Sequence, residues 1–235
     1  PTPPPPSSCI HFSHRGNDWI VAAASDHTIS FWRYEEKKNL CVWVNQITTE
    51  DIQKQLLLVP PSQHTNGSIW AVGGENNTLT IYDLNSRKRR YVHDCIHKDS
   101  TSSMVYIHSL CLVATGSFDK TVKFFDYEHG RPRGRTLHHG EPVKTLSAAN
   151  DKILSCGPCT VILWDLQSFS LLCKLPSTNT TFVGATLVAF TDLEKGAQYR
   201  CLTGDQKGTF KVWLPSSSTS TIDKPLLLQT FTGMN

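Results

Sequence analysis

Five segments along the chain share one pattern, in which a Thr precedes an aromatic residue by four positions at the end of a β-branched run. The segments are 26–33, 76–83, 119–126, 158–165 and 207–214. Their aromatic residues, Trp32, Tyr82, Phe125, Trp164 and Trp213, are separated by 50, 43, 39 and 49 residues. Self-similarity at this period indicates stacked copies of one supersecondary unit, because a single unit cannot bury its apolar face alone. The chain is therefore predicted to be one array of similar units.

Each unit is predicted to contain a hairpin: an aliphatic strand such as residues 112–117, a small polar turn, and a β-branched, aromatic return strand. Helical periodicity is absent apart from a short turn expected within residues 48–55. The innermost strands are expected near 8–12, 55–59, 102–107, 142–147 and 185–190. The outer strands are expected near 39–44, 88–93, 134–137, 171–175 and 226–231. The sequence thus predicts four strands per unit and an all-β fold.

These repeats resemble those of the WD-repeat family of β-propellers, which run about 40–45 residues with four strands per blade. The name-giving dipeptide is intact at Trp164-Asp165, and Tyr82-Asp83 and Phe125-Asp126 are near matches. The resemblance covers residues 9–232 and implies a β-propeller with about five four-stranded blades. The blades are expected at about 9–46, 47–94, 95–138, 139–176 and 177–235, after a proline-rich linker at 1–8.

The number of blades leaves three arrangements open. Propellers have about 4–8 blades, so five blades could close a ring. The chain could equally be part of a longer propeller. A third arrangement is an open propeller whose exposed sheet edges are completed by strands from a partner.

The resemblance also implies a buried polar network of a His, a Ser or Thr, a turn Asp and the Trp in each strong repeat. Satisfied buried polar groups of this kind fix one geometry. The fourth repeat has His139, Ser155 and Trp164, but Pro158 stands at the Asp position. The fifth repeat has Trp213 but neither the His nor the Asp. No blade is expected to hold the complete network, so apolar packing should dominate.

No catalytic constellation is found in the sequence, and no cofactor or metal site is predicted. Residues 156–159 read Cys-Gly-Pro-Cys, which matches a thioredoxin-type redox motif. That chemistry needs a helix after the first Cys to lower the thiol pKa, whereas the residues that follow are predicted to form a strand. A tight turn is favoured, and we expect a protein that is not an enzyme.

Basic residues cluster between the third and fourth strands of the first three blades, where a propeller would place them on one face as a positive arc. This set is Lys37, Lys38, Arg87, Lys88, Arg89, Arg90, Arg131, Arg133 and Arg135. The simpler interpretation is a solvated rim. The functional alternative is a module that binds an anionic ligand, namely an RNA backbone, a phosphopeptide or a phospholipid head group, because Arg forks grip anionic oxygens.

The opposite face is formed by the turns of the five hairpins, and the resemblance makes this face the commonest protein-binding surface. Its candidate contact residues are His27, Asn76, Phe118, Lys120 and Lys207. Phe118 is the strongest candidate, because an aromatic residue at a turn tip is a plausible hot spot. The sequence therefore favours a non-catalytic scaffold that binds other proteins as a subunit of a complex; nucleic acid and anionic lipid are less favoured partners.

Net charge and cysteine usage limit the remaining possibilities for partners and cellular compartment. The net charge is only +3, which by itself predicts neither a nucleic-acid nor a membrane partner. No apolar run approaches the roughly 20 residues of a membrane span. Most of the eight cysteines lie in apolar runs, as buried free thiols do. We expect a reduced protein of the cytoplasm or the nucleus.

Overall fold

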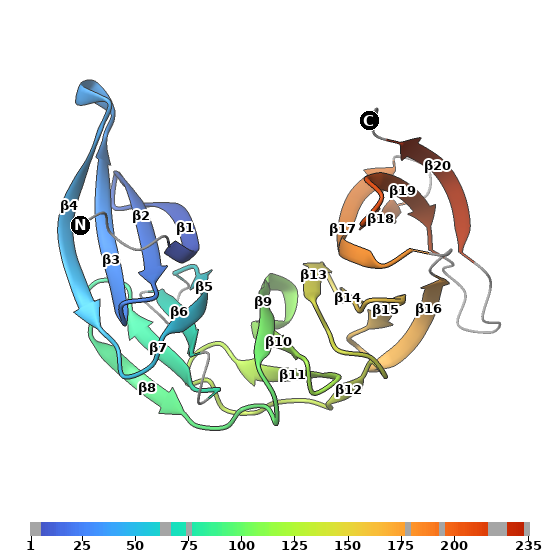
Figure 1. The fold of residues 1–235 in the computed structure, drawn as a ribbon, viewed down its shortest axis with the longest axis horizontal. Helices are drawn as coiled ribbons and strands as arrows, with labels where there is room; N and C mark the ends of the chain where they lie inside the picture. The colour runs from blue at the N-terminus through green and yellow to red at the C-terminus, as the bar shows by residue number, and fades with distance from the viewer. Residues whose placement is uncertain are drawn as a thin grey trace. The chain divides into compact units, whose positions relative to one another are not determined.

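The computed structural model of the chain describes residues 6–61, 67–73, 77–176, 180–192, 196–215 and 225–232. Across these ranges the chain forms five four-stranded antiparallel sheets and no α-helix (Figure 1). The chain divides into two compact units, residues 1–101 with 127–130, and residues 102–126 with 131–235. The predicted all-β architecture with about five four-stranded blades is confirmed.

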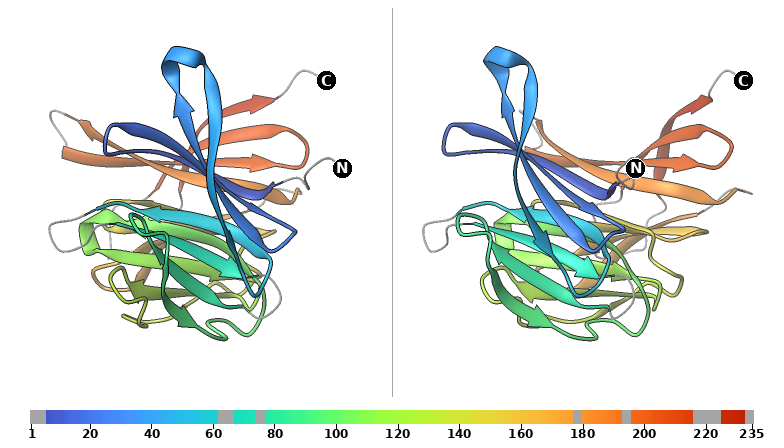
Figure 2. Two further views of the ribbon diagram at one scale, coloured as in Figure 1. Left: turned by 90° about the vertical axis from the view of Figure 1, so that its left-hand side faces the viewer. Right: turned by 60° about the vertical axis from the view of Figure 1, so that its left-hand side comes forward.

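The first unit contains two sheets, each built from four consecutive strands. The first sheet is β1 (Pro6–His14), β2 (Asn17–Ala24), β3 (Thr28–Glu35) and β4 (Leu40–Thr48), with a 3-10 turn, η1 (Glu36–Lys38), at the β3–β4 tip. The second sheet is β5 (Gln53–Val59), β6 (Ser68–Gly73), β7 (Leu79–Asp83) and β8 (Arg89–His93). The β3–β4 hairpin reaches well beyond β1 and β2 (Figure 2).

The second unit contains three sheets of the same meander topology. They comprise β9 (Thr101–Ile107), β10 (Leu112–Ser117), β11 (Thr121–Asp126) and β12 (Leu137–His138); then β13 (Thr145–Ala149), β14 (Lys152–Cys156), β15 (Thr160–Asp165) and β16 (Ser170–Pro176); then β17 (Phe182–Asp192), β18 (Gly196–Asp205), β19 (Thr209–Leu214) and β20 (Leu226–Thr232). A 3-10 turn, η2 (His108–Leu110), joins β9 to β10.

The aromatic residue of the repeat marks a bulge in four of the five sheets. The register between the third and fourth strands shifts immediately before Trp32, Tyr82, Trp164 and Trp213. A bulge adds one residue to a strand and increases its local twist. The aromatic position that defines the repeat in the sequence is thus also the point at which the outer strand changes register.

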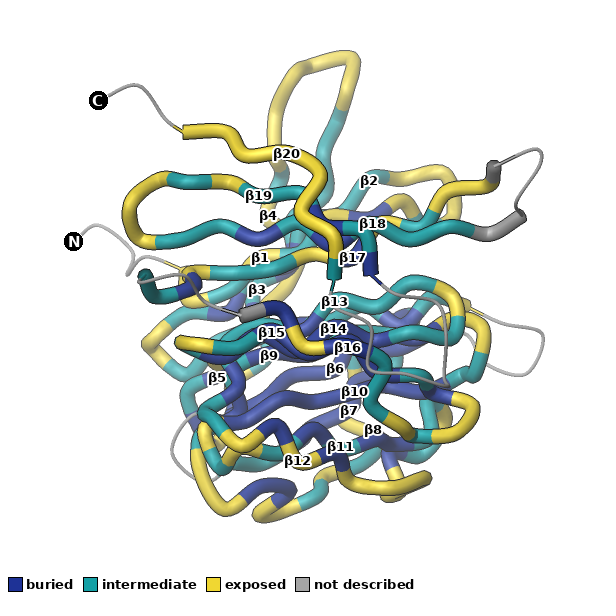
Figure 3. Tube along the Cα trace, turned by 90° about the vertical axis from the view of Figure 1, so that its right-hand side faces the viewer, coloured by how far each residue is buried: buried dark blue, intermediate teal, exposed yellow. Residues whose placement is uncertain are grey.

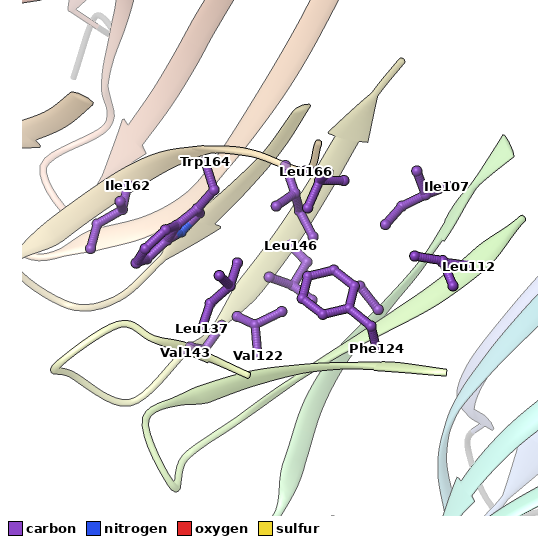
Figure 4. Packing of buried hydrophobic residues seen from close by; sticks show 12 residues of the cluster. Ile107, Leu112, Val122, Phe124, Leu137, Val143, Leu146, Ile162, Trp164 and Leu166 are labelled. Carbon is purple, nitrogen blue, oxygen red and sulfur yellow. The ribbon is translucent and has the colours of Figure 1, made fainter. Parts of the chain in front are cut away.

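Apolar residues between neighbouring sheets hold each unit together. In the first unit Val21, Ile29 and Phe31 pack against Ile69 and Tyr82 of the next sheet. In the second unit one cluster joins the sheets of β9–β12 and β13–β16, with Trp164 and Phe124 on opposite sides of it (Figure 4). Another cluster joins β13–β16 to β17–β20 through residues that include Leu163, Cys201 and Trp213.

Three expectations from the sequence are wrong in detail. The first strand begins at Pro6, so residues 6–8 are not part of a linker; Pro is tolerated there because β1 is an edge strand. The short turn expected within residues 48–55 is not helical, because β4 ends at Thr48 and β5 begins at Gln53. The outer strand expected at 134–137 is only Leu137–His138. Gly134, with a φ of +85°, departs there from strand geometry.

Candidate partner-binding surfaces

The hairpin turns that were predicted to bind proteins are built around a carboxylate. In the β2–β3 turn the Asp26 carboxylate accepts hydrogen bonds from the Thr28 N–H at 3.2 Å and the Thr28 hydroxyl at 2.6 Å. His27 at the tip has a φ of +61°, and its carbonyl accepts a hydrogen bond from the Thr49 N–H. The backbone of this turn is therefore fixed on a rigid scaffold. Asn76, the candidate of the second turn, lies outside the described residues.

The β10–β11 turn presents Phe118 to solvent. The Asp119 carboxylate accepts hydrogen bonds from the Thr121 N–H at 3.0 Å and the Thr121 hydroxyl at 2.6 Å. The Asp119 N–H donates to Ser117 Oγ, and Lys120 adopts the left-handed conformation with a φ of +70°. The side chain of Phe118 is 44% exposed. The exposed aromatic side chain of Phe118 thus lies on a turn whose backbone is fixed by the hydrogen bonds of Ser117 and Asp119.

The β18–β19 turn corrects the expectation that the fifth repeat lacks a turn Asp. The Asp205 carboxylate accepts hydrogen bonds from the N–H groups of Lys207 and Thr209, both at 3.0 Å. Burial acts to raise the pKa of Asp205, but hydrogen bonds from Thr209, the Thr180 hydroxyl and Lys207 together hold this pKa below its usual value. Asp205 lies two positions earlier than the corresponding Asp26 and Asp119 relative to the repeat Thr, which is why the sequence frame missed it. Lys207 is exposed in this turn.

The fourth repeat builds a nearly complete buried network, with Glu141 taking the place of the missing turn Asp. Trp164 Nε1 donates to Ser155 Oγ at 2.8 Å, and Ser155 Oγ lies 2.9 Å from His139 Nδ1. The Glu141 carboxylate accepts hydrogen bonds from the Cys159 and Thr160 N–H groups. Burial lowers the pKa of His139, which favours the neutral imidazole, and the Nδ1 of a neutral ring can accept a hydrogen bond from the Ser155 hydroxyl. Pro158 stands at the Asp position, as the sequence indicates, and Glu141 supplies the carboxylate of this turn from outside the hairpin.

The cysteine motif is a turn at the end of β14. Cys156 is buried, and burial raises the pKa of its thiol to about 11. Cys159 is exposed, and the β15 strand follows directly. A raised pKa is the opposite of what a redox-active thiolate requires. Within the described ranges, no group of three or more His, Cys, Asp or Glu side chains could hold a metal ion.

Most basic residues of the first unit already have partners. Lys38 pairs with Glu35 at 2.8 Å at the β3–β4 tip, beside the exposed Lys37. Arg89 Nη1 lies 2.8 Å from Glu50 Oε1, and Arg90 lies 3.9 Å from Asp83. The pKa of Arg89 is raised by its hydrogen bond and charge interaction with Glu50.

Arg87 differs from the other basic residues because its guanidinium lies over two aromatic rings. It is 4.8 Å from the centroid of Trp19 and 5.4 Å from that of Phe31. Arg87, an anion-binding candidate from the sequence, is therefore held against the first sheet in a cation–π geometry.

The basic residues of the second unit, Arg131, Arg133 and Arg135, are exposed between β11 and β12. The Arg131 N–H donates to Asp126, and the Arg133 N–H donates to the Phe124 carbonyl. The positive arc of nine residues includes members of both units and stays a prediction.

A cavity of about 1090 Å³ lies between the two sheets of the first unit, beside the outer strands β4 and β8. We call it the outer groove. One wall is formed by the end of β4 and its connection to β5; the other is formed by β7, β8 and the residues that follow. The lining residues used below are Glu50, Asp51, Gln53, Tyr82, Lys88, Arg89, Asp94 and Lys98. The sequence predicted Lys88 and Arg89 as anion-binding candidates but not the cavity that they line.

Exposed apolar residues gather on the last sheet, which the sequence did not predict. Eight of twelve exposed large apolar residues among those described belong to it: Val183, Val188, Phe190, Phe210, Leu226, Leu227, Leu228 and Phe231. Strand β20 is exposed along its whole length (Figure 3). Phe210 on β19 pairs with Phe231 on β20. Alternation along a strand shows which residues share a face, but not which face has a neighbouring sheet.

Comparison with known proteins agrees with the repeat seen in the sequence. Residues 92–126 match the model of the WD40 family, described as WD domain, G-beta repeat. This segment contains β9, β10 and β11, whose turn carries Phe118. The match covers one repeat, and the five four-stranded antiparallel sheets agree with it. The chain fits the WD-repeat propeller family.

A solved structure similar to this WD-repeat chain is the crystal structure of the computationally designed Ika8 protein. The two superpose with a TM-score of 0.65 at 17% sequence identity, over 97% of this chain and 61% of that chain. This chain therefore spans less than two thirds of the designed protein. At this identity the likeness shows the fold alone. None of the described helices of the WD-repeat chain is long and apolar enough to span a membrane.

Proposed function

We propose that this WD-repeat chain is a non-catalytic scaffold that binds proteins within a multiprotein assembly. WD repeats are in general protein-interaction scaffolds. The observation that carries the proposal for this chain is Phe118, 44% exposed on a turn fixed by the Asp119 carboxylate. Rigidly held, exposed aromatic residues are typical anchors of protein interfaces.

The same turn supplies a second contact. Lys120 follows Phe118 after one residue, is exposed, and is held in the left-handed conformation by the turn. A partner that covers the Phe118 ring would bring an acidic group within reach of the Lys120 ammonium. The proposed surface is therefore an apolar anchor with a cationic neighbour, which favours a protein partner with an apolar pocket and an acidic rim.

Affinity capture with the purified chain tests this proposal. Proteins bound by the wild-type chain are quantified by mass spectrometry and compared with those bound by Phe118→Ser. Phe231→Ser is the matched control, since Phe231 is 49% exposed on the edge strand β20. We expect at least one protein to be captured by the wild type and by the control, and to be lost with Phe118→Ser. The partner is then purified, and its direct binding is measured.

Two results would count against the proposal in different ways. Equal capture by the wild type and Phe118→Ser would remove the β10–β11 turn as the contact surface. Capture of no protein above an unrelated control chain would remove the scaffold function itself. Circular dichroism of each variant ensures that a loss of capture does not reflect unfolding.

A further inference from the structure

The outer groove is large and carries several charged side chains. Its volume of about 1090 Å³ lies at the upper end of the roughly 300–1,000 Å³ of small-molecule sites. The charged and amide side chains in its lining include Glu50, Asp51, Gln53, Lys88 and Arg89, with Lys98 further along. Its size and its charges suit a segment of polypeptide that carries charged side chains.

Arg89, the main basic residue of the groove, already forms an ion pair with the carboxylate of Glu50. Arg89 of β8 and Glu50, which follows β4, lie on opposite walls, and their Nη1 and Oε1 atoms are 2.8 Å apart. The side chain of Glu50 is 85% exposed and that of Arg89 is 53% exposed, so this ion pair is weak and readily exchanged. Glu50 therefore marks the position that the carboxylate of a ligand would take on Arg89. Lys88, next to Arg89 in the sequence, and Lys98, further along the groove, add positive charge to its lining.

A buried acceptor in the groove calls for an N–H donor. The residue Gln53 is 2% exposed, and its Nε2 donates to the Asp51 carbonyl at 2.7 Å. Its Oε1 is buried and accepts no hydrogen bond from any described residue. Leaving a buried acceptor without a partner is costly. Gln53 Oε1 is shielded from solvent, so a ligand N–H satisfies it only when the Gln53 side chain turns toward the groove. A peptide backbone carries such donors along its length.

The aromatic and acidic residues of the groove favour a peptide over a nucleic acid. Single-stranded nucleic acid binds by stacking its bases on exposed aromatic rings. Tyr82 and His97 are the only residues with aromatic rings among the described lining residues, and they are 4% and 3% exposed. The carboxylates of Asp51 and Asp94 would also repel a continuous phosphate backbone. A peptide avoids this repulsion because it can place one acidic side chain at Arg89 and neutral residues elsewhere.

We infer that the outer groove binds an acidic peptide segment of a partner protein. An Asp or Glu side chain of that segment replaces Glu50 on Arg89, with Lys88 beside it, and the peptide backbone donates to Gln53 Oε1 once that side chain turns toward the groove. Charge complementarity at Arg89 selects the segment, while Arg87, stacked on Trp19, holds the adjoining turn in place. The inference rests on the proposed scaffold function, for which it names one class of partner segment.

Selection from a displayed library of random twelve-residue peptides tests the inference on the full 235-residue chain. We expect the selected peptides to be enriched in Asp and Glu. A representative peptide should bind Lys88→Glu/Arg89→Glu at least tenfold more weakly than the wild type. Glu50→Gln should bind it several-fold more tightly, because Arg89 is then released from its internal partner. This gain cannot arise from a loss of folding.

Lys37→Glu/Lys38→Glu is the matched control, because it makes the same change of charge in the same unit but outside the groove. Binding lost equally in this control and in the groove variant would mean that only net charge matters, and would overturn the inference. No enrichment of acidic residues, or unchanged affinity in Lys88→Glu/Arg89→Glu, would overturn it as well. Tight binding of polyuridylate that depends on Arg89 would assign the groove to nucleic acid instead.

The outcome for the groove is separable from that for the scaffold function. Partner capture that fails with Phe118→Ser but survives Lys88→Glu/Arg89→Glu would overturn the groove alone. Peptide binding that survives Phe118→Ser while no cellular protein is captured would remove the scaffold function but leave the groove as a peptide site.

Discussion

Glu141 Oε2 accepts a hydrogen bond from the Cys159 backbone N–H at 2.8 Å. The same oxygen accepts a second one from the Thr160 N–H at 3.2 Å. In other sheets the N–H of the repeat Thr donates to a carboxylate of the turn itself, as the Thr28 N–H does to Asp26. Pro158 stands where the turns of the first and third repeats have an Asp. Glu141, which lies 18 residues before Cys159 in the sequence, thus supplies the missing carboxylate.

Replacing Glu141 by Ala should destabilise the second unit by about 1–2 kcal/mol, because hydrogen bonds to a charged acceptor contribute about 1.5–3 kcal/mol and the turn is partly exposed to water. Urea unfolding followed by circular dichroism measures the change. Glu36→Ala, which removes an exposed Glu at the β3–β4 tip, should change stability by less than about 0.5 kcal/mol. Equal effects of the two variants would contradict the assigned role of Glu141.

Replacing Ser155 by Ala should cost about 2 kcal/mol. Ser155 is fully buried and links Trp164 Nε1 to His139 Nδ1, so the substitution leaves two buried polar groups without a partner. Ser25→Ala, at an exposed turn position, is the control and should be near neutral. The difference in urea midpoint between the two variants measures the network. A neutral Ser155→Ala would show that apolar packing alone holds this sheet.

The repeat was readable from the sequence because its frame is local. Thr160 and Trp164 lie on one strand, and the alternation of apolar residues around them fixes the hairpin without long-range information. Glu141 was missed because its partners depend on how the loop before β13 folds over the next hairpin. The outer groove was missed for the same reason, since Glu50 and Arg89 lie 39 residues apart. Exposure of β20 was missed because alternation does not reveal which strand has a neighbour.

Acid should weaken the second unit through His139. Burial lowers the pKa of this His in the folded chain, whereas in the unfolded chain the group titrates near 6.5. Below pH 6.5 the unfolded state therefore binds more protons, and stability falls until the lowered folded pKa is reached. Comparing urea unfolding at pH 7.5 and pH 5.5 measures this fall. His139→Gln should be less stable at pH 7.5 but should show a smaller loss between the two pH values. An identical pH dependence in the variant would contradict a neutral, buried His139.

The two cysteines of the Cys-Gly-Pro-Cys turn should differ sharply in reactivity. Cys159 is exposed, whereas burial both shields the Cys156 thiol and raises its pKa to about 11. Because the thiolate is the reactive species, iodoacetamide at pH 8 should modify Cys159 in the native chain and leave Cys156 unmodified. Peptide mass spectrometry after timed quenching gives both rates, and the same reaction in urea shows that Cys156 reacts once unfolded. Exposed Cys9 and Cys41 serve as internal references for the rate of an accessible thiol. Rapid native modification of Cys156, or its oxidation to a disulfide with Cys159 under mild oxidant, would contradict a purely structural turn.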